Sequence, residues 1–434
     1  MKRRMLLRIS AVGLIAASVG MVRFTALGQE GTHTDEPYSV VSLATLGGSS
    51  GAGNSINNRG WVMGAANLAG NESVHATLWL EGLTFDLGTL GGPNSGVEWQ
   101  VMNGHGLVAG IAETADLDPL GEQWSCSAFF PTVTGHTCLG FKWLDGVMTA
   151  LPALGGNNGY ASGVNQQGQI VGWAETTVHD STCVSPQVLQ FEPVVWDPPG
   201  YQAQELAPLH GDPDGAATAI NDLGQVVGIS GTCDVAVGAF TAAHAVLWQN
   251  GHVSNLGNLG GVAWNTPTAI NDQGEVVGFS DRPGDQNGVP NFHAFLWTAK
   301  TGIKDLGTLP GDVLSEALGV NDLGQIVGLS CTAGFATCRA FLWQNGAMTD
   351  LNKLVDRESS LYLVFANSIN DRGEISGGGY DQTTGESPAF RAEPGWNSSP
   401  ADMQANPGAD VPRPNLPPML LPRGFGRIGG SGPR

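Results

Sequence analysis

A nine-residue motif recurs seven times along the chain, and this repeat constrains the fold more than any other feature of the sequence. Each copy places an asparagine three residues before one glycine and seven residues before another. Successive copies lie 46 to 62 residues apart, a period that is typical of β-propeller blades and too long for most helical solenoids. The copies occupy 56–64, 102–110, 164–172, 220–228, 270–278, 320–328 and 369–377.

Each motif belongs to a longer unit that holds four β-prone runs, which we name a to d. Run a ends at the motif asparagine, run b is the Val-Val-Gly part, run c resembles His-Ala-Phe-Leu-Trp, as at 293–297, and run d resembles Leu-Gly-Thr-Leu, as at 306–309. The a–b and c–d links are rich in Asn, Asp and Gly, which is the composition of tight hairpins. Two consecutive hairpins in each unit predict a four-stranded antiparallel blade.

The two ends of the repeat array complement each other. The last unit stops after its c run at Arg391, whereas residues 38–46 form a d run that has no a, b or c run before it. This d run can complete the last blade and remove the exposed sheet edges. The sequence therefore predicts an all-β fold, a seven-bladed β-propeller of four-stranded antiparallel blades in which the N-terminal strand closes the last blade. An open β-solenoid is the alternative, but it needs polar caps that the sequence lacks.

Composition outside the repeats predicts three flanking segments. Residues 1–28 combine basic residues, an apolar stretch and small residues, as an export signal peptide does. Arg3 and Arg4 also suit a twin-arginine signal, so the export pathway stays open. We expect a short linker at 29–37, the propeller at 38–392 and a disordered Pro/Gly-rich tail at 393–434. The predicted location is therefore extracellular or periplasmic, with no transmembrane segment.

Charge and cysteine content narrow the partners and the compartment. The net charge of −20 would repel a phosphate backbone, so nucleic acid is excluded, and we expect a monomer. An even number of cysteines in an exported chain favours disulfides. Fifteen pairings are possible, and we favour those that join Cys126 with Cys138, Cys183 with Cys233 and Cys331 with Cys338.

The repeated His-Ala-Phe-Leu-Trp runs and the Leu-Gly-Thr-Leu-Gly-Gly runs resemble those of the HAF-type extracellular repeat proteins of bacteria. The resemblance covers about residues 40–391, with the tripeptide present at His293, Ala294 and Phe295. It implies a surface or periplasmic repeat protein. It implies no established reaction, substrate or catalytic residue.

The recurrent asparagines, glycines, tryptophans and histidines are best interpreted as structural, because every blade needs the same turn and packing geometry. Departures from the repeat are better candidates for a binding site, and we expect them on the face that carries the d–a links and the long b–c loops. Aromatic and acidic departures would form a bowl suited to a sugar, a cation or a basic peptide, with ordinary loop variation as the alternative. They are Glu98, Trp99, Tyr160, Asp212, Asp214, Trp264 and Glu316.

One b–c loop concentrates four carboxylates that could hold calcium, although the strict calcium-loop spacing is missing and a solvated acidic loop is the alternative. They are Glu113, Asp116, Asp118 and Glu122. No other cofactor is expected.

Two functions from different classes are compatible with the sequence. The first is a non-catalytic extracytoplasmic binding or scaffolding propeller for an unknown glycan, peptide or protein, because the body of the chain is repetitive and concentrates no titratable groups. The second is a propeller hydrolase or lyase that acts on a glycan or peptide, for which carboxylates or a histidine should converge at the axis.

Overall fold

The computed structural model describes most of the chain between the two termini. The described residues are 38–122, 126, 129–284, 290–355, 359–395 and 412–414. The predicted signal peptide and linker lie outside them, as does most of the predicted tail. Within these residues, no helix has the length and apolarity that crossing a membrane requires.

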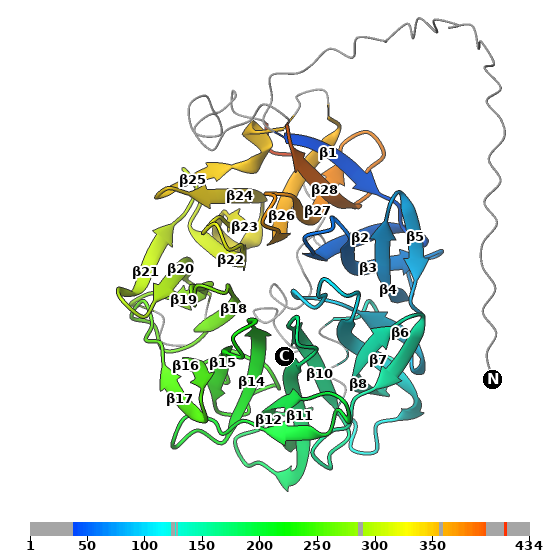
Figure 1. The fold of residues 1–434 in the computed structure, drawn as a ribbon, viewed down its shortest axis with the longest axis vertical. Coiled ribbons are helices and arrows are strands. Elements are labelled where there is room, and N and C mark those ends of the chain that lie inside the picture. The colour runs from blue at the N-terminus through cyan, green and yellow to red at the C-terminus, as the bar shows by residue number, and fades with distance from the viewer. Residues whose placement is uncertain are drawn as a thin grey trace, which may run out of the picture. The chain divides into compact units, whose positions relative to one another are not determined.

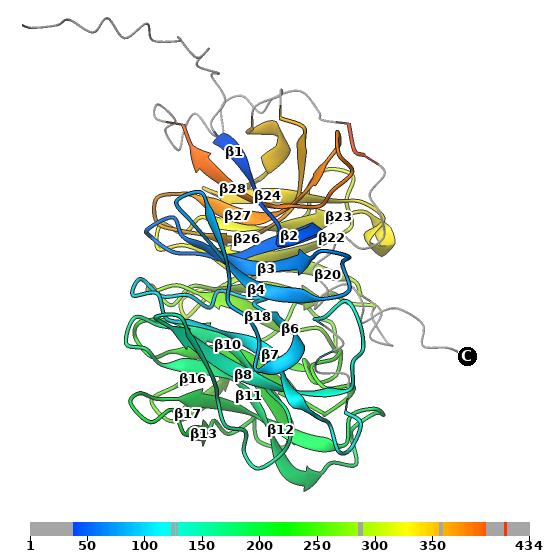
Figure 2. The same ribbon diagram turned by 90° about the vertical axis from the view of Figure 1, so that its right-hand side faces the viewer.

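Seven four-stranded antiparallel sheets stand around a central axis, so the predicted seven-bladed propeller is confirmed (Figure 1). In each blade strand a lies nearest the axis and strand d at the rim, and Figure 2 shows the same ring from its side. Burial follows this order: β10 (Gly159–Val164), an a strand, is buried throughout, whereas β9 (Val147–Ala150), a d strand, is mostly exposed.

The inner two strands of each blade carry the repeated motif. The a strands are β2 (Gly47–Ile56), β6 (Gly91–Gly96), β10, β14 (Asp214–Ile220), β18 (Thr266–Ile270), β22 (Leu314–Val320) and β26 (Leu361–Ile369). The b strands are β3 (Val62–Leu68), β7 (Val108–Leu117), β11 (Ile170–His179), β15 (Val226–Gly231), β19 (Val276–Asp281), β23 (Ile326–Cys331) and β27 (Ile375–Asp381).

The outer two strands complete each blade, and two short 3-10 helices, η1 (Ala333–Phe335) and η2 (Leu351–Lys353), lie in its links. The c strands are β4 (Val74–Leu80), β8 (His136–Leu144), β12 (Leu189–Trp196), β16 (His244–Gln249), β20 (Phe292–Thr298), β24 (Cys338–Gln344) and β28 (Ala389–Pro394). The d strands are β5 (Leu83–Asp86), β9, β13 (Ala203–Glu205), β17 (His252–Asn255), β21 (Gly302–Gly307), β25 (Ala347–Asp350) and β1 (Tyr38–Leu43).

The d strands begin and end earlier in the chain than the Leu-Gly-Thr-Leu runs that we predicted to form them. In the fourth blade β17 pairs with β16 through Gln249 and His252, and the strand ends before the Leu-Gly-Asn-Leu run at 256–259. A two-residue c–d turn sets this register, because the strand must begin directly after the turn. The Leu-Gly-Thr-Leu runs therefore form mainly the links to the next blade.

The N-terminal strand closes the ring as predicted. Strand β1 pairs antiparallel with β28, from Tyr38 opposite Pro394 to Leu43 opposite Ala389. Tyr38 is 1% exposed, and its hydroxyl donates to the backbone oxygen of Gly373 at 3.2 Å. The blade thus extends two residues beyond the predicted boundary at residue 392, because Glu393 also pairs with β1.

Steric constraints explain why glycine occupies both recurrent positions of the motif. The first, as in Gly324 at φ +72°, takes a left-handed conformation that favours glycine. The second lies where strands a and b approach closely: a Cβ at Gly328 would meet the backbone oxygen of Glu316 at 1.9 Å. Six of the seven blades have a register shift at this place, as between Ala317 and Gly319, so the predicted turn and bulge chemistry is confirmed.

The motif asparagines join the blades into a closed ring of hydrogen bonds. Each side-chain amide donates to the backbone oxygen of the next motif asparagine, and Asn370 returns to Asn57 at 2.9 Å. The other six bonds, of 2.9 to 3.3 Å, start from Asn57, Asn103, Asn165, Asn221, Asn271 and Asn321. The same side chain also accepts from its own turn, as Asn321 does from the backbone of Leu323 and Gln325.

Replacement of one ring asparagine should destabilise the whole propeller. Asn321→Ala removes one bond to the next blade and three within its turn, and leaves buried groups unpaired, so we expect a loss of about 3 kcal/mol in the free energy of unfolding. Denaturant titration measures this loss. The control is Asn258→Ala, because exposed Asn258 only accepts from Gly260 in its own turn; similar losses in both variants would contradict the role of the ring.

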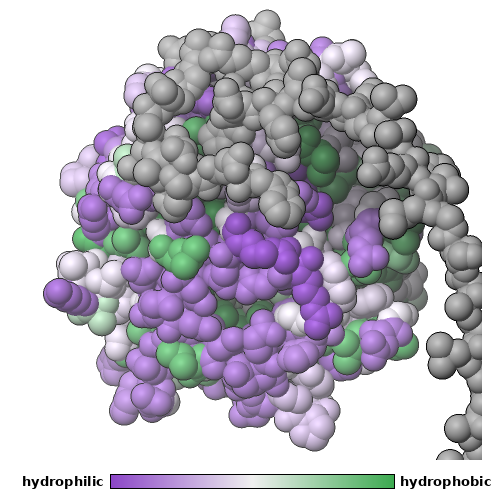
Figure 3. Space-filling view, turned by 45° about the horizontal axis from the view of Figure 1, so that its top comes forward, coloured by the Kyte–Doolittle hydropathy of each residue, from purple (hydrophilic) through white to green (hydrophobic). Residues whose placement is uncertain are grey.

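Three disulfides hold the b–c loops. They are the favoured pairs, Cys126–Cys138, Cys183–Cys233 and Cys331–Cys338. The second joins the loops of two neighbouring blades, and the other two each close a loop within one blade. Hydrophilic side chains cover much of the described surface between small hydrophobic groups (Figure 3).

Candidate functional site

A pocket of about 200 Å³ opens on the axis, where the a–b turns of the blades meet. Motif asparagines and the residues that follow them form its rim, and Gln100 and Met102 also line it. This volume is below the roughly 300–1,000 Å³ of pockets for drug-sized ligands. The pocket therefore suits a single side chain or a small polar group.

Aspartates from four consecutive blades form one half of the rim. Each accepts, through Oδ1, the backbone N–H of the residue at the same motif position in the preceding blade, at 2.8 to 3.0 Å. In the other three blades Asn58, Gly104 and Gln166 stand at this position, so the negative charge lies on one side of the pocket. The four aspartates are Asp222, Asp272, Asp322 and Asp371.

The second carboxylate oxygens of this rim differ in their partners. Oδ2 of Asp371 accepts from Asn58 at 2.6 Å. Among the described residues, no donor is paired with Oδ2 of Asp222, Asp272 or Asp322. Burial, and then the nearby charges of Asp371 and Asp272, raise the pKa of Asp322. The rim thus concentrates negative charge that the described protein leaves unbalanced.

The sequence analysis did not single out these aspartates as functional. A signal was present, because an acid follows the motif asparagine in four consecutive units. The Asn-Asp pair was interpreted as turn chemistry alone. The turn also directs the acids of different blades to the same axis, which the sequence of one turn does not show.

A segment of the second blade forms the floor of the pocket. Strand β6 ends at Gly96, and residues 97–101 continue without strand structure. Gln100 extends towards the sixth blade, where a Cβ at Gly319 would lie 2.7 Å from its Nε2 atom. This amide nitrogen is buried and has no hydrogen-bond partner among the described residues. The floor therefore offers a donor, and the rim offers acceptors.

The strand pairing in this segment shows that the predicted counterpart of Trp99 in the other blades was wrong. We placed Trp99 four residues before the motif asparagine, as the counterpart of Ala317 in the sixth unit. In the structure Gly96 pairs with Ile111, so Gly96 is the counterpart of Glu316, which pairs with Leu329. The second blade therefore contains two extra residues before its asparagine, and Trp99 belongs to this insertion.

The structure brings only part of the predicted bowl together. Trp99 packs edge-on against Tyr160 with ring centroids 5.9 Å apart, and Phe129 stacks on Tyr160 at 5.2 Å. Burial, and then the charge of Glu98, raise the pKa of Tyr160 well above its usual value. Asn54 donates to the backbone oxygen of Val97 at 2.5 Å, and lies 3.5 Å from the Glu98 carboxylate.

The other predicted bowl residues lie at separate places. Asp212 accepts from His244 and from Ser230, at 2.8 and 2.7 Å. Trp264 is buried in another apolar cluster. Ligand binding by the predicted bowl stays a prediction.

Buried carboxylates are a separate feature of the blades. Glu316 is fully buried, neither of its oxygens has a hydrogen-bond partner among the described residues, and burial raises its pKa to about 8. Asp214 accepts from the backbone of Phe191 at 2.9 Å, and burial raises its pKa to about 7. Burial, and then Glu205 and Asp214, raise the pKa of Glu192 to about 8. These acids are protonated over much of the neutral range.

Three of the four predicted calcium ligands are engaged by the protein itself. Glu113 accepts from Asn94 and Thr134, Asp118 from Asn158 at 2.7 Å, and Glu122 from the backbone of residues 188 and 189. Asp116 is exposed. In the described part of the chain, no three of these carboxylates place their oxygens around a common point. Calcium binding there stays a prediction.

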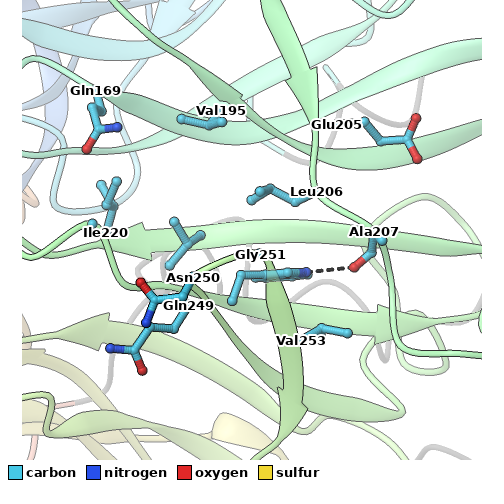
Figure 4. A pocket seen from close by; sticks show the side chains of 13 residues that line it. Gln169, Val195, Glu205, Leu206, Ala207, Ile220, Gln249, Asn250, Gly251 and Val253 are labelled. Carbon is cyan, nitrogen blue, oxygen red and sulfur yellow. Dashed lines mark hydrogen bonds between the residues drawn. The ribbon is translucent and has the colours of Figure 1, made fainter.

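The repeated tryptophans lie between blades, as interpreted from the sequence. The Trp248 indole donates to the backbone oxygen of Ala207 at 2.7 Å, and Trp79 and Trp196 make the same bond to Ala44 and Pro152. Trp248 lines an apolar groove of about 400 Å³ between the third and fourth blades (Figure 4). The groove follows from this packing, and nothing in the described structure shows an occupant.

The histidines that begin the c strands pair with nearby carboxylates. His75 contacts Asp86 at 2.8 Å, and His293 contacts Asp305 at 2.9 Å. Among the described residues such pairs occur in three of the seven blades, and the third joins His244 to Asp212 at 2.8 Å. The structural interpretation of these histidines therefore holds for each pair.

Comparisons with known proteins find only distant structural similarity. The chain matches no protein-family model and no curated protein sequence. It is similar in structure to XC5397 of Xanthomonas campestris, a gluconolactonase, at 12% identity and a TM-score of 0.32, with 66% of this chain and 90% of that chain covered. It is also similar to Trypanosoma rangeli sialidase, at 10% identity and a TM-score of 0.36, with 82% of this chain and 58% of that chain covered. Values this low carry no argument about activity.

Proposed function

We propose that the chain is a non-catalytic extracytoplasmic binding propeller whose axial pocket receives a positively charged side chain of a peptide or protein partner. One observation carries this proposal: the open carboxylate oxygens of Asp222, Asp272 and Asp322 surround a pocket of about 200 Å³. A fixed array of acceptors favours a cation because the carboxylates are already held in place. The predicted export signal and the three disulfides support a location outside the cytoplasm.

The residues at the floor of the pocket favour a peptide, rather than a simple inorganic cation, as the ligand. The Gln100 amide nitrogen is a buried donor that an inorganic cation would leave unpaired. A peptide supplies both the positive charge for the rim and backbone oxygens for this donor. This site lies among the a–b turns, on the opposite face of the ring from the b–c loops on which the sequence analysis placed the function.

A hydrolase or lyase is the second candidate, and it requires carboxylates or a histidine that converge on a substrate at the axis. The histidines at the starts of the c strands pair with carboxylates of the blades. Glu316 is fully buried, and among the described residues burial accounts for its raised pKa without a contribution from a neighbouring charge. An enzyme of this class needs two groups that flank a substrate.

Neutralising the rim should weaken binding of basic peptides. We expect the double variant Asp272→Asn/Asp322→Asn to bind lysine- and arginine-containing peptides about tenfold more weakly, because two charges are lost while the acceptors of the turn remain. Fluorescence anisotropy with peptides selected on an array measures this effect.

A matched control tests whether the pocket, rather than the overall charge, binds the peptide. Asp145→Asn removes a charge from an exposed c–d turn, and c–d turns share the face of the a–b turns. We expect this variant to bind like the wild type at 0.15 M salt, where distant charges are screened. Equal weakening by both changes, or no binding by the wild type, would refute the proposed function.

A further inference from the structure

Two buried carboxylates lie close together between the sixth and seventh blades, and the propeller supplies one arginine to neutralise both. Asp312, in the link before β22, has a side chain that is 0% exposed. Its Oδ2 atom accepts from Ser330 at 3.0 Å and from Arg339 at 2.7 Å. Arg339 also donates to Asp350 at 3.0 Å. One arginine thus faces two carboxylates, which leaves one negative charge in excess in a buried place, where an unbalanced charge is costly.

The missing positive charge comes from the C-terminal tail. Nη2 of Arg413 lies 2.8 Å from Oδ1 of Asp312, an ion-pair distance, and this oxygen has no hydrogen-bond partner among the described residues. Nη1 of Arg413 donates to Oγ1 of Thr337 at 3.3 Å. With Arg413 in place, two arginines face two aspartates, and the group is electrically neutral.

The surroundings of Asp312 are built by elements distant in the chain. Thr337 lies in the loop that the Cys331–Cys338 disulfide closes, and its backbone pairs with Thr332. Tyr362, on β26 of the seventh blade, has a buried hydroxyl without a hydrogen-bond partner among the described residues. Burial raises the pKa of this hydroxyl, and the positive charge of Arg413 acts in the opposite direction.

The equivalent position in the fourth blade shows that the propeller fold does not require a carboxylate that contacts two arginines. Asp212 follows Gly211 as Asp312 follows Gly311, and accepts from Ser230 as Asp312 does from Ser330. There His244 takes the place of Arg339, and no residue of the described tail contacts the carboxylate. The acceptor for a second guanidinium is thus specific to the sixth blade.

We propose that Asp312, Thr337, Arg339, Asp350 and Tyr362 form a guanidinium socket, and that the C-terminal tail of the same chain occupies it through Arg413. The planar guanidinium suits a buried carboxylate better than an ammonium group does, because it offers several fixed donors. Occupation ties the tail to the face of the d–a links and b–c loops. This site is separate from the axial pocket, so it stands independently of the proposed function.

Hydrogen exchange of the full chain tests the socket through the loop that contacts Arg413. We expect Arg413→Ala to accelerate amide exchange at 332–337 about five- to tenfold, because the Thr337 contact and the neutralising charge are lost together. Arg413→Lys should give an intermediate rate. Arg423→Ala is the matched control, since it removes an arginine from the same tail and should leave these amides unchanged.

A peptide added in trans gives the second measurement. The peptide 408–418 carries Arg413, and it is titrated into full-length wild type and into the Arg413→Ala variant. The vacated socket of the variant should bind this peptide at least tenfold more tightly than the wild type, because the attached tail competes at an effective concentration on the order of millimolar. A peptide with alanine for Arg413 should not bind.

Each of the two measurements has a result that would overturn the proposal. Unchanged exchange at 332–337 in Arg413→Ala, or the same change in Arg423→Ala, would overturn the socket whatever the peptide does. Equal binding of the arginine and alanine peptides would overturn recognition of the guanidinium. The rim variants of the axial pocket should leave all these readouts unchanged.

Discussion

Deletion of residues 38–43 is expected to lower the melting temperature by about 10 °C or more, and to cause the protein to aggregate. Strand β1 supplies the entire outer strand of the last blade, and Tyr38 within it is almost fully buried. Loss of one buried large side chain alone costs about 3–5 kcal/mol, which corresponds to several degrees in a chain of this size. Without β1, strand β28 becomes an open edge to which another chain can pair.

The matched control is deletion of residues 30–35, which removes the same number of residues directly before the described part of the chain. Differential scanning calorimetry and light scattering compare the two deletions. The control should melt at the wild-type temperature. If deletion of 38–43 leaves both the melting temperature and the light scattering unchanged, closure by β1 contributes nothing to stability.

The second large effect should come from Glu316. We expect Glu316→Gln to stabilise the protein at pH 8–9 by about 4–5 kcal/mol relative to the wild type, and by only about 1 kcal/mol at pH 5. Burial raises the pKa of this carboxyl to about 8 in the folded state, whereas an unfolded glutamate titrates near 4.3. A glutamine mimics the protonated acid at every pH.

The direction of this pH effect follows from proton binding. Between pH 4.3 and pH 8 the folded wild type holds a proton on Glu316 that the unfolded chain has released, so the free energy of unfolding falls as the pH rises. Urea titrations from pH 5 to pH 9 measure the difference between wild type and variant. Glu386→Gln, at an exposed position, should show no such trend. A difference that stays constant across this range would show that Glu316 is not buried as an isolated acid.

The number of blades, their four strands and the closure of the ring were all predictable from the sequence. The Asn-Gly turn motif encodes local backbone geometry, and its first glycine indeed has positive φ, as at Gly324. The repeat also made the disulfides predictable, because it placed Cys183 and Cys233 in corresponding loops of adjacent blades.

The candidate site was harder to predict because its parts come from different blades. The two-residue insertion lies before Asn103 and leaves the motif itself unchanged. Counting back from the motif asparagine therefore gave Trp99 the wrong counterpart in the other blades. Only the pairing of Gly96 with Ile111 reveals the insertion. Glu316 was predicted to line a binding bowl at a d–a position, whereas it lies buried in strand β22, where its burial depends on the neighbouring blades and not on its own strand.

The sequence by itself determined the period, the turns and the closure of this propeller, because these depend on residues that are adjacent or regularly spaced in the chain. The tertiary structure decided which groups share an environment: Gln100 with Gly319, Asp322 with Asp371, and Arg413 with Asp312. Charge, burial and hydrogen bonding act through space between residues that the chain separates widely. The axial pocket and the tail socket therefore became visible only once the blades were placed around their axis.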